Sequence, residues 1–130
     1  ISQEHMAEIL GVNRSTYSLW ELGINIIPLH SLCYFADYFN FSLDYVLCLS
    51  NNKDAKDLIK GLDLEVLGSN MKAIRVKHNL SQENIANMLD VKQACIARYE
   101  KGIICISVSN LYKFSKEFKV TINSLCGKTK

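Results

Sequence analysis

The histidines are the first side chains to consider for catalysis or metal binding. They are His5, His30 and His78, and they lie far apart in the sequence. No Ser–His–acid arrangement, glycine-rich phosphate loop or HExxH motif accompanies them. We therefore expect each histidine to be a solvated polar residue, and we expect neither an enzyme nor a bound cofactor.

The five cysteines lack the spacing of a metal site, since they form no CxxC pair and have no paired histidines nearby. No apolar run reaches the roughly 18 residues of a membrane span, and no signal segment opens the chain. A cytoplasmic protein with no membrane partner is therefore expected, and its odd cysteine count indicates free thiols. Small apolar filling is favoured over redox sensing for these residues, with Cys95 and Cys105 as the candidates for a reactive thiol.

An internal repeat organises the chain that must position any functional residues. Sliding the sequence on itself by 79 residues aligns residues 1–48 with residues 80–127 without a gap. The identical positions are mainly caps, core residues and turns, which a shared fold would retain; they include Ser2, Gln3, Glu4, Ala7, Leu10, Val12, Glu21, Gly23, Ile24, Leu32, Phe35 and Phe39. We predict one domain over residues 1–48, a linker over 49–63 and a second domain over 64–130.

Each copy contains two short helices joined by a tight turn. A serine at the N-cap opens the first helix, the pattern breaks at residues 11–13 or 90–92, and a glycine closes the second helix. This is the layout of a helix-turn-helix. The pattern predicts helices over residues 3–10, 14–22, 29–39 and 43–47 in the first copy and 82–89, 93–101, 108–118 and 122–126 in the second.

The segment between the copies resembles neither of them. Residues 49–63 are polar, with three lysines and three aspartates, and predict a linker with one helical turn over residues 54–60 that Gly61 ends. Residues 64–78 carry an apolar stripe at Leu64, Leu67, Met71 and Ile74. This stripe predicts a leading helix for the second unit alone.

The leading helix suggests an ion pair that the first unit lacks. Arg75 could reach Glu100 across the core and form a partly buried pair, whereas the matching acid Glu21 has no such partner in the sequence. Because an unpaired acid in that place costs stability, we expect the natural chain to contain about one more helix before Ile1.

The two copies resemble the phage-repressor-like (XRE, Cro-type) helix-turn-helix family. The similarity lies in LSQENIANMLDVKQACIARYEKG and ISQEHMAEILGVNRSTYSLWELG, with the flanking LGSNMKAIR helix and the closing segments FSLDYVL and VTINSLC. It covers nearly all of both units and fails only on the linker. The resemblance implies an all-α fold of two tandem lambda-repressor-like bundles of four to five helices, the first without its leading helix, and double-stranded DNA as the partner.

The resemblance also implies which residues contact DNA. In this family the second helix of the motif lies in the major groove, and its N-terminal residues reach base edges. Arg can bond guanine, Gln can bond adenine, and Ala can contact a thymine methyl. Gln3 and Gln82 open the preceding helices, whose N-termini point amides at a phosphate. The readout candidates by position are Arg14, Ser15, Ser18 and Leu19 in the first unit and Lys92, Gln93, Ala94, Ala97 and Arg98 in the second.

Charge distinguishes the two units. Residues 1–48 hold 1 Lys or Arg against 5 Asp or Glu, a net charge of −4, while residues 65–130 hold 11 against 5, a net charge of +6. Because neutralising phosphates supplies most non-specific affinity, we expect the second unit to carry most of the DNA binding.

Apolar and aromatic residues suggest contacts other than DNA. The loops after the two motifs, residues 24–27 and 103–106, contain no basic residue, and we expect at least half of their isoleucines to fold inward. Tyr34 and Tyr38 are matched by Lys113 and Glu117 in the second unit. A partner surface and a solvent-facing pair both fit these tyrosines.

Two functions follow from the sequence. The first is a sequence-specific DNA-binding transcriptional regulator, in which the second domain reads the major groove and the first assists or forms a homodimer. The alternative is a protein-interaction module, such as an antitoxin or anti-repressor, that uses the acidic, aromatic-rich first domain.

Overall fold

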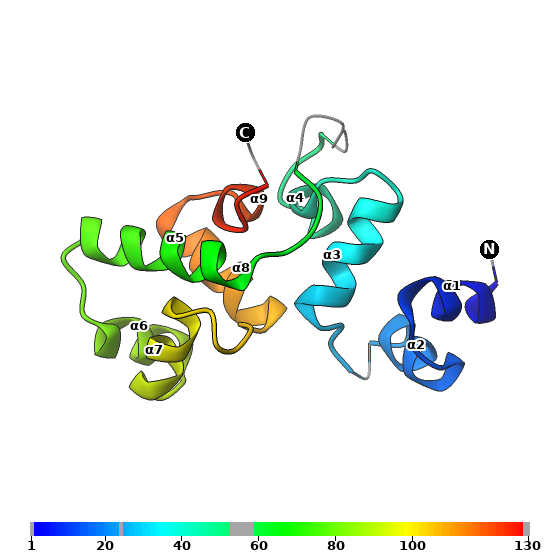
Figure 1. Ribbon diagram of the computed structural model, residues 1–130, viewed down its shortest axis with the longest axis horizontal. Helices are drawn as coiled ribbons and strands as arrows, with labels where there is room; N and C mark the ends of the chain where they lie inside the picture. The colour runs from blue at the N-terminus through cyan, green and yellow to red at the C-terminus, as the bar shows by residue number, and fades with distance from the viewer. Residues whose placement is uncertain (1, 24, 53–58, 129–130) are drawn as a thin grey trace.

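The computed structural model describes residues 2–23, 25–52 and 59–128, and these form helices without a β-sheet (Figure 1). The first unit contains α1 (Gln3–Leu10), α2 (Arg14–Glu21), α3 (Leu29–Tyr38) and α4 (Leu43–Val46). The second unit contains α5 (Leu64–Lys77), α6 (Gln82–Leu89), α7 (Gln93–Glu100), α8 (Val108–Phe118) and α9 (Ile122–Leu125). The predicted fold of tandem helix-turn-helix bundles is confirmed. Residues 53–58 of the predicted linker lie outside the described residues, and Ile59 and Lys60 are not helical.

Local capping explains where the motif helices begin and end. The hydroxyl of Ser2 accepts a hydrogen bond from the amide of His5, and the hydroxyl of Ser81 accepts one from the amide of Asn84. At the other ends, Gly11 and Asp90 occupy equivalent positions with φ angles of 70° and 56°. This left-handed conformation stops each helix and turns the chain sharply into α2 or α7.

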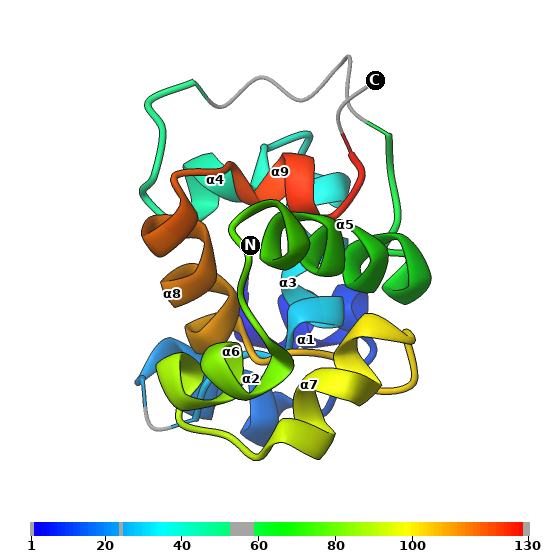
Figure 2. The same ribbon diagram turned by 90° about the vertical axis from the view of Figure 1, so that its left-hand side faces the viewer.

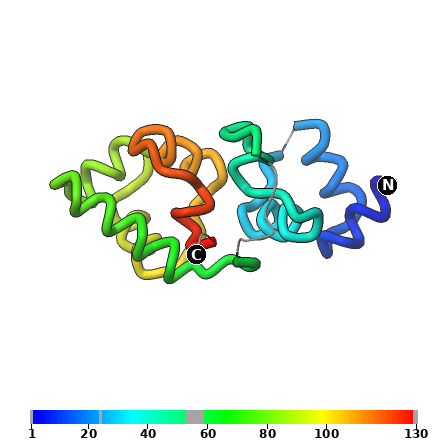
Figure 3. Tube along the Cα trace, turned by 90° about the horizontal axis from the view of Figure 1, so that it is seen from above, coloured from blue at the N-terminus to red at the C-terminus, as the bar shows by residue number. Residues whose placement is uncertain are grey.

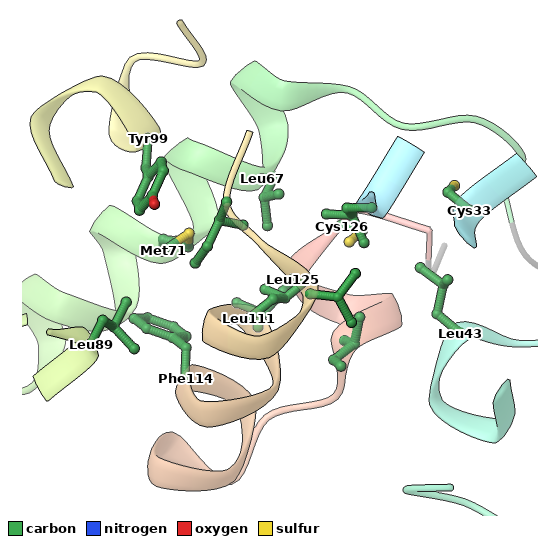
Figure 4. Packing of buried hydrophobic residues seen from close by; sticks show 14 of the residues in the cluster. Cys33, Leu43, Leu67, Met71, Leu89, Tyr99, Leu111, Phe114, Leu125 and Cys126 are labelled. Atoms are coloured by element: carbon green, nitrogen blue, oxygen red, sulfur yellow. The ribbon is translucent and has the colours of Figure 1, made fainter. Parts of the chain in front are cut away.

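The core of the second unit forms where α5 packs against α7 and α9. Leu67 and Met71 of α5 are buried against the same cluster as Phe114 and Leu125 (Figure 4). Gly68 permits this close crossing, because a Cβ at this position would overlap the backbone carbonyl oxygens of Tyr99 and Glu100. The helix that leads the second unit therefore supports α7 directly.

The motif of the first unit is less buried than that of the second. Ile96 and Tyr99 of α7 are buried, whereas α2 has no buried residue. The equivalent residues of α2, Tyr17 and Trp20, are half-buried and pack edge to face with ring centroids 6.5 Å apart. Helix α7 is therefore the more firmly held of the two.

The predicted ion pair between Arg75 and Glu100 is confirmed. Arg75 Nε lies 2.7 Å from Glu100 Oε2, and the two side chains are 14% and 5% exposed. Arg75 Nη2 donates a second bond to Glu100 Oε1 at 3.0 Å, and Nη1 donates to the carbonyl of Leu80 at 3.0 Å. Glu21, the matching acid, is exposed and has no cation paired with it among the described residues, but it accepts a hydrogen bond of 2.7 Å from Gln3 Nε2.

The two units lie side by side and share one hydrophobic cluster. Seen from above, they follow one another along the long axis of the molecule (Figure 3). The buried cluster continues from Met71 and Phe114 in the second unit to Leu43 and Cys33 in the first. Helices α4 and α9 pack against each other where the units meet.

Replacing Arg75 with Met should lower the free energy of unfolding by about 3 kcal/mol, because the buried carboxylate of Glu100 loses its cationic partner. Urea denaturation followed by circular dichroism measures this change. Lys72→Met is the control, since Lys72 is exposed on the same helix and the substitution is chemically similar. Equal losses in the two variants would contradict a structural role for the ion pair.

Candidate nucleic-acid interface

Both helix-turn-helix motifs lie along one edge of the molecule. In Figure 1 the pairs α1–α2 and α6–α7 occupy the lower edge at opposite ends, and α4 and α9 lie above them. Figure 2, which is turned about the vertical axis, places the same helices at the same heights. The second helix of each motif is thus carried on the side opposite the α4–α9 contact.

Helix α7 presents most of the predicted readout residues to solvent. Lys92 is the N-cap of this helix, and its side chain makes no capping hydrogen bond. Within α7, Ala97 is half-buried. The exposed candidates are Lys92, Gln93, Ala94 and Arg98. These side chains provide cationic and amide groups beside small apolar ones, which is the chemistry that base edges require.

A polar network holds Gln93 in place. Gln93 Nε2 donates to Gln82 Oε1 at 3.1 Å, and Gln82 Nε2 donates to Glu100 Oε1 at 3.0 Å. Glu100 is held in turn by Arg75. An amide nitrogen carries two hydrogens, so Gln93 retains one N–H and its carbonyl oxygen for a ligand. These are the groups that pair with the N7 and N6 edge of adenine.

The network gives the side chain of Gln82 a structural role that could not be predicted from the sequence. Its side chain is half-buried and links Glu100 to Gln93. The predicted phosphate contact requires only the backbone of α6. Here the amide of Asn84 is capped by Ser81, while the amides of Gln82 and Glu83 lie in the first turn of α6, where an amide has no partner within its own helix. Those amides fit an anion, although the carboxylate of Glu83 in the same turn opposes one.

The first unit has the equivalent pair of motif helices but different side chains at the positions of this site. Arg14 stands in the position of Gln93, and Asn13 stands in the position of Lys92. Asn13 Oδ1 caps α2 by accepting from the amide of Thr16 at 2.7 Å. Arg14 and Ser15 are exposed, while Ser18 and Leu19 are half-buried. The first unit therefore offers fewer accessible readout groups than the second.

The cations near α7 differ in whether they are free to bind a ligand. The hydrogen bond and attraction to Glu100 raise the pKa of Arg75. Because its guanidinium is paired with this buried carboxylate, Arg75 is not available to bind a ligand. Lys92, Arg98 and Lys101 are exposed. Around α2, Arg14 is accompanied by the exposed Glu21. The exposed positive charge is therefore concentrated on the second motif.

The loops after the motifs combine buried and exposed isoleucines. Ile106 is buried, and Ile27 and Ile104 are half-buried. Ile26 and Ile103 are 65% and 64% exposed. Ile24 lies outside the described residues. These loops have no basic side chain to offer to a phosphate, and the side-chain amide of the exposed Asn25 is an uncharged donor.

The cysteines and acidic groups do not form a metal site in the described ranges, where no cluster of three or more His, Cys, Asp or Glu side chains occurs. All five cysteines are free thiols. Burial raises the pKa of Cys33 and Cys105, and it raises that of Cys126 to about 12. This opposes the reactive role considered for Cys105, because the thiolate is the reactive form.

None of the described helices is long and apolar enough to cross a membrane.

Replacing Gln82 with Leu should lower the free energy of unfolding by about 1 to 2 kcal/mol, since the largely buried Glu100 loses a donor. Gln3→Leu is the matched control, because it removes the equivalent bond to the exposed Glu21 and should cost less. Urea denaturation of both variants measures the difference. A larger loss for Gln3→Leu would contradict the network described here.

The sequence matches the HTH_3 family, described as helix-turn-helix, over residues 1–46 and 71–125. No curated protein matches the chain. Among solved structures, the restriction-modification controller protein C.AhdI from Aeromonas hydrophila is 24% identical, with a TM-score of 0.45, and the match covers 48% of this chain and 96% of that one.

Two further solved structures are similar. The hypothetical transcription factor NHTF from Neisseria is 28% identical, with a TM-score of 0.45, over 53% of this chain and 85% of that one. The DNA-binding domain of BldD is 23% identical, with a TM-score of 0.43, over 49% of this chain and 93% of that one. The family match covers both motifs, and the chain thus belongs to the XRE-type helix-turn-helix family of DNA-binding transcription regulators.

Proposed function

We propose that the chain is a sequence-specific regulator in which the second unit reads the major groove and the first unit assists. The main support is the exposure of Lys92, Gln93 and Arg98 along α7, within a motif whose geometry is held by buried contacts. The first unit has the same arrangement of helices but a single basic residue.

Electrostatics favours the second unit as the main source of affinity. It carries a net charge of +6, and the first unit carries −4. Each cation that neutralises a phosphate releases counterions and strengthens binding at low salt. Lys92 and Lys101 at the two ends of α7 are suited to phosphate contacts, because both side chains are exposed.

Specificity would come from Gln93 and Arg98. The remaining N–H and carbonyl of Gln93 suit adenine, and the guanidinium of Arg98 suits guanine O6 and N7. Ala94 and Ala97 leave space for a thymine methyl. Since the bond to Gln82 restricts the rotation of the Gln93 side chain, less side-chain entropy would be lost when it meets a base.

The first unit would assist through Arg14 and Ser15, which are exposed at the start of α2. Both can donate hydrogen bonds to base edges or phosphates. The acidic side chains of this unit oppose the phosphate backbone, so its contribution should be the smaller one. A homodimer through the first unit stays a prediction, for which the outer face of α3 is the available surface.

A protein partner is the second candidate function, favoured by the same face of α3. Tyr34 and Tyr38 are 54% and 52% exposed there. Behind them, Phe39 contacts Phe35 and Tyr38 with centroid distances of 5.0 Å each. A rigid aromatic surface of this kind suits the centre of a protein interface.

Replacing Arg98 with Ala should weaken binding to a selected duplex by about 1 to 3 kcal/mol and relax specificity at one base pair, since a bidentate base contact is lost. Fluorescence anisotropy at several salt concentrations measures the affinity. Lys72→Ala is the control, because it removes one exposed charge from α5 rather than α7.

The proposal would be refuted by an affinity that does not depend on salt, or by equal affinities of the Arg98 variant and the parent. The second candidate predicts a stable hetero-complex in a pull-down. That complex should survive Arg98→Ala and be lost when Tyr34 and Tyr38 are both replaced by Ser.

A further inference from the structure

The two short helices α4 and α9 cap each other. The carboxylate of Asp44 accepts hydrogen bonds from the amides of Ile122 at 2.8 Å and Asn123 at 3.0 Å. In return, Asn123 Oδ1 accepts a hydrogen bond from the amide of Leu43 at 3.1 Å. The N-terminus of each helix, which has unpaired amides of its own, is thus satisfied by a side chain from the other unit.

The capping residues are equivalent in the repeat. Asp44 corresponds to Asn123 and Leu43 corresponds to Ile122 under the same shift of 79 residues. Each unit therefore uses the same patch to contact the other, which is the arrangement of an isologous two-fold interface. Here both halves of the interface belong to one chain.

The contact is part of the hydrophobic core. Leu43 and Ile122 are both 0% exposed, and the adjoining Cys33 and Cys126 are 2% and 3% exposed. Figure 4 shows the buried side chains continuing from Met71 and Leu125 past Cys126 toward Leu43 and Cys33. The interface between the two units is therefore a buried one that contains apolar side chains as well as the polar capping pair.

The pairing of an acid with an amide favours α4 against α9 over α4 against the α4 of a second copy. Asp44 and Asn123 are 5% and 7% exposed. A homodimer that used α4 of two copies would place a second aspartate where Asn123 lies, and two buried carboxylates would repel each other. The unequal pair therefore opposes a homodimer built on two α4 helices, and it favours the pairing of α4 with α9 that is seen within the chain.

A second set of contacts fixes the relative position of the units and does not follow the repeat. Lys128 Nζ lies 2.8 Å from Asp37 Oδ1, and its side chain is 3% exposed. The same ammonium donates to the carbonyl of Ile59 at 3.2 Å, and the amide of Gly61 donates to Asp37 Oδ2 at 2.8 Å. These bonds tie the end of the second unit and the segment before α5 to α3.

We propose that one chain is a pseudo-dimer that binds a duplex in a 1:1 complex, with α7 and α2 in successive major grooves of two unlike half-sites. This rests on the proposed function. Both helices lie along the edge opposite α4 and α9 (Figures 1 and 2). Because the interface holds the two units in one arrangement, the half-sites should lie on one face of the double helix, at the spacing of about one turn or 10 base pairs that paired helix-turn-helix units use.

The first experiment uses a duplex selected from a randomised library by the whole chain. We expect a mass of one chain per duplex by light scattering, and hydroxyl-radical protection of two adjacent grooves on one face. Inserting about 5 base pairs between the half-sites should weaken binding at least about tenfold, because the first unit then faces away.

The second experiment weakens the interface within the chain. Asn123→Asp sets a carboxylate against Asp44, so the units should separate on the segment between them and the 5-base-pair insertion should lose its effect. Ser124→Asp is the matched control, since this exposed neighbour on α9 adds the same charge. The double variant Asp44→Asn with Asn123→Asp restores an acid–amide pair and should restore sensitivity to spacing, even if Asn123→Asp alone is poorly folded.

Several outcomes would overturn the inference. A complex of two chains on a palindromic site, protection of a single groove, or tolerance of the insertion by the parent chain would each contradict it. In all three cases Arg98→Ala would still weaken binding, so the proposed function would stand. If no duplex is selected and Arg98→Ala has no effect, the proposed function itself fails.

Discussion

The second motif depends on the interactions of one buried carboxylate, that of Glu100. It lies at the end of α7 and accepts bonds from Arg75 of α5 and Gln82 of α6, so one charged group joins three helices. A buried acid is unfavourable unless its lone pairs are satisfied, and here they are. Any displacement of α7 would break these bonds together. The orientation of Gln93, at the other end of the network, is therefore tied to the stability of the core.

The first motif shows what happens when this constraint is relaxed. Glu21 keeps the equivalent bond to Gln3 but is exposed, and α2 has no buried residue. An exposed hydrogen bond contributes little, because water competes for both groups. The first motif thus preserves the geometry of the second with fewer buried contacts. This difference agrees with the charge contrast between the units, since the more firmly held motif is also the more basic one.

Most of the helical structure could be predicted from the sequence, because its signals are local. Signals such as the N-cap serines, the turns at Gly11 and Asp90, and the apolar stripe of α5 placed the ends of α1 to α9 within one residue of their observed positions, whereas the helical turn predicted over residues 54–60 does not extend to Ile59 and Lys60. The pairing of Arg75 with Glu100 could also be predicted, since both residues stand on helices whose order the family resemblance implies.

The other contacts between elements could not be predicted in the same way. The link from Gln82 to Gln93 depends on the distance between two helices, and the sequence contains no measure of that distance. The contact of Asp44 with α9 joins residues 78 and 79 positions apart in the chain. A signal for it existed, because Asp44 and Asn123 are polar residues at the same place in the two closing helices, each directly after an apolar residue. The sequence does not say whether these two side chains are buried, so they could equally have been ordinary polar residues that face solvent.

The division of the chain into unlike halves has a physical consequence for recognition. In a symmetric dimer, every substitution in a reading helix changes both half-sites at once. In this chain, α2 and α7 differ at each proposed readout position, and the capping pair differs in charge. The two proposed reading surfaces can therefore change independently, while the Asp44 and Asn123 pair opposes a contact between two α4 helices. A tandem repeat that keeps its interface inside one chain thereby gains an asymmetric binding surface without depending on the concentration of a second subunit.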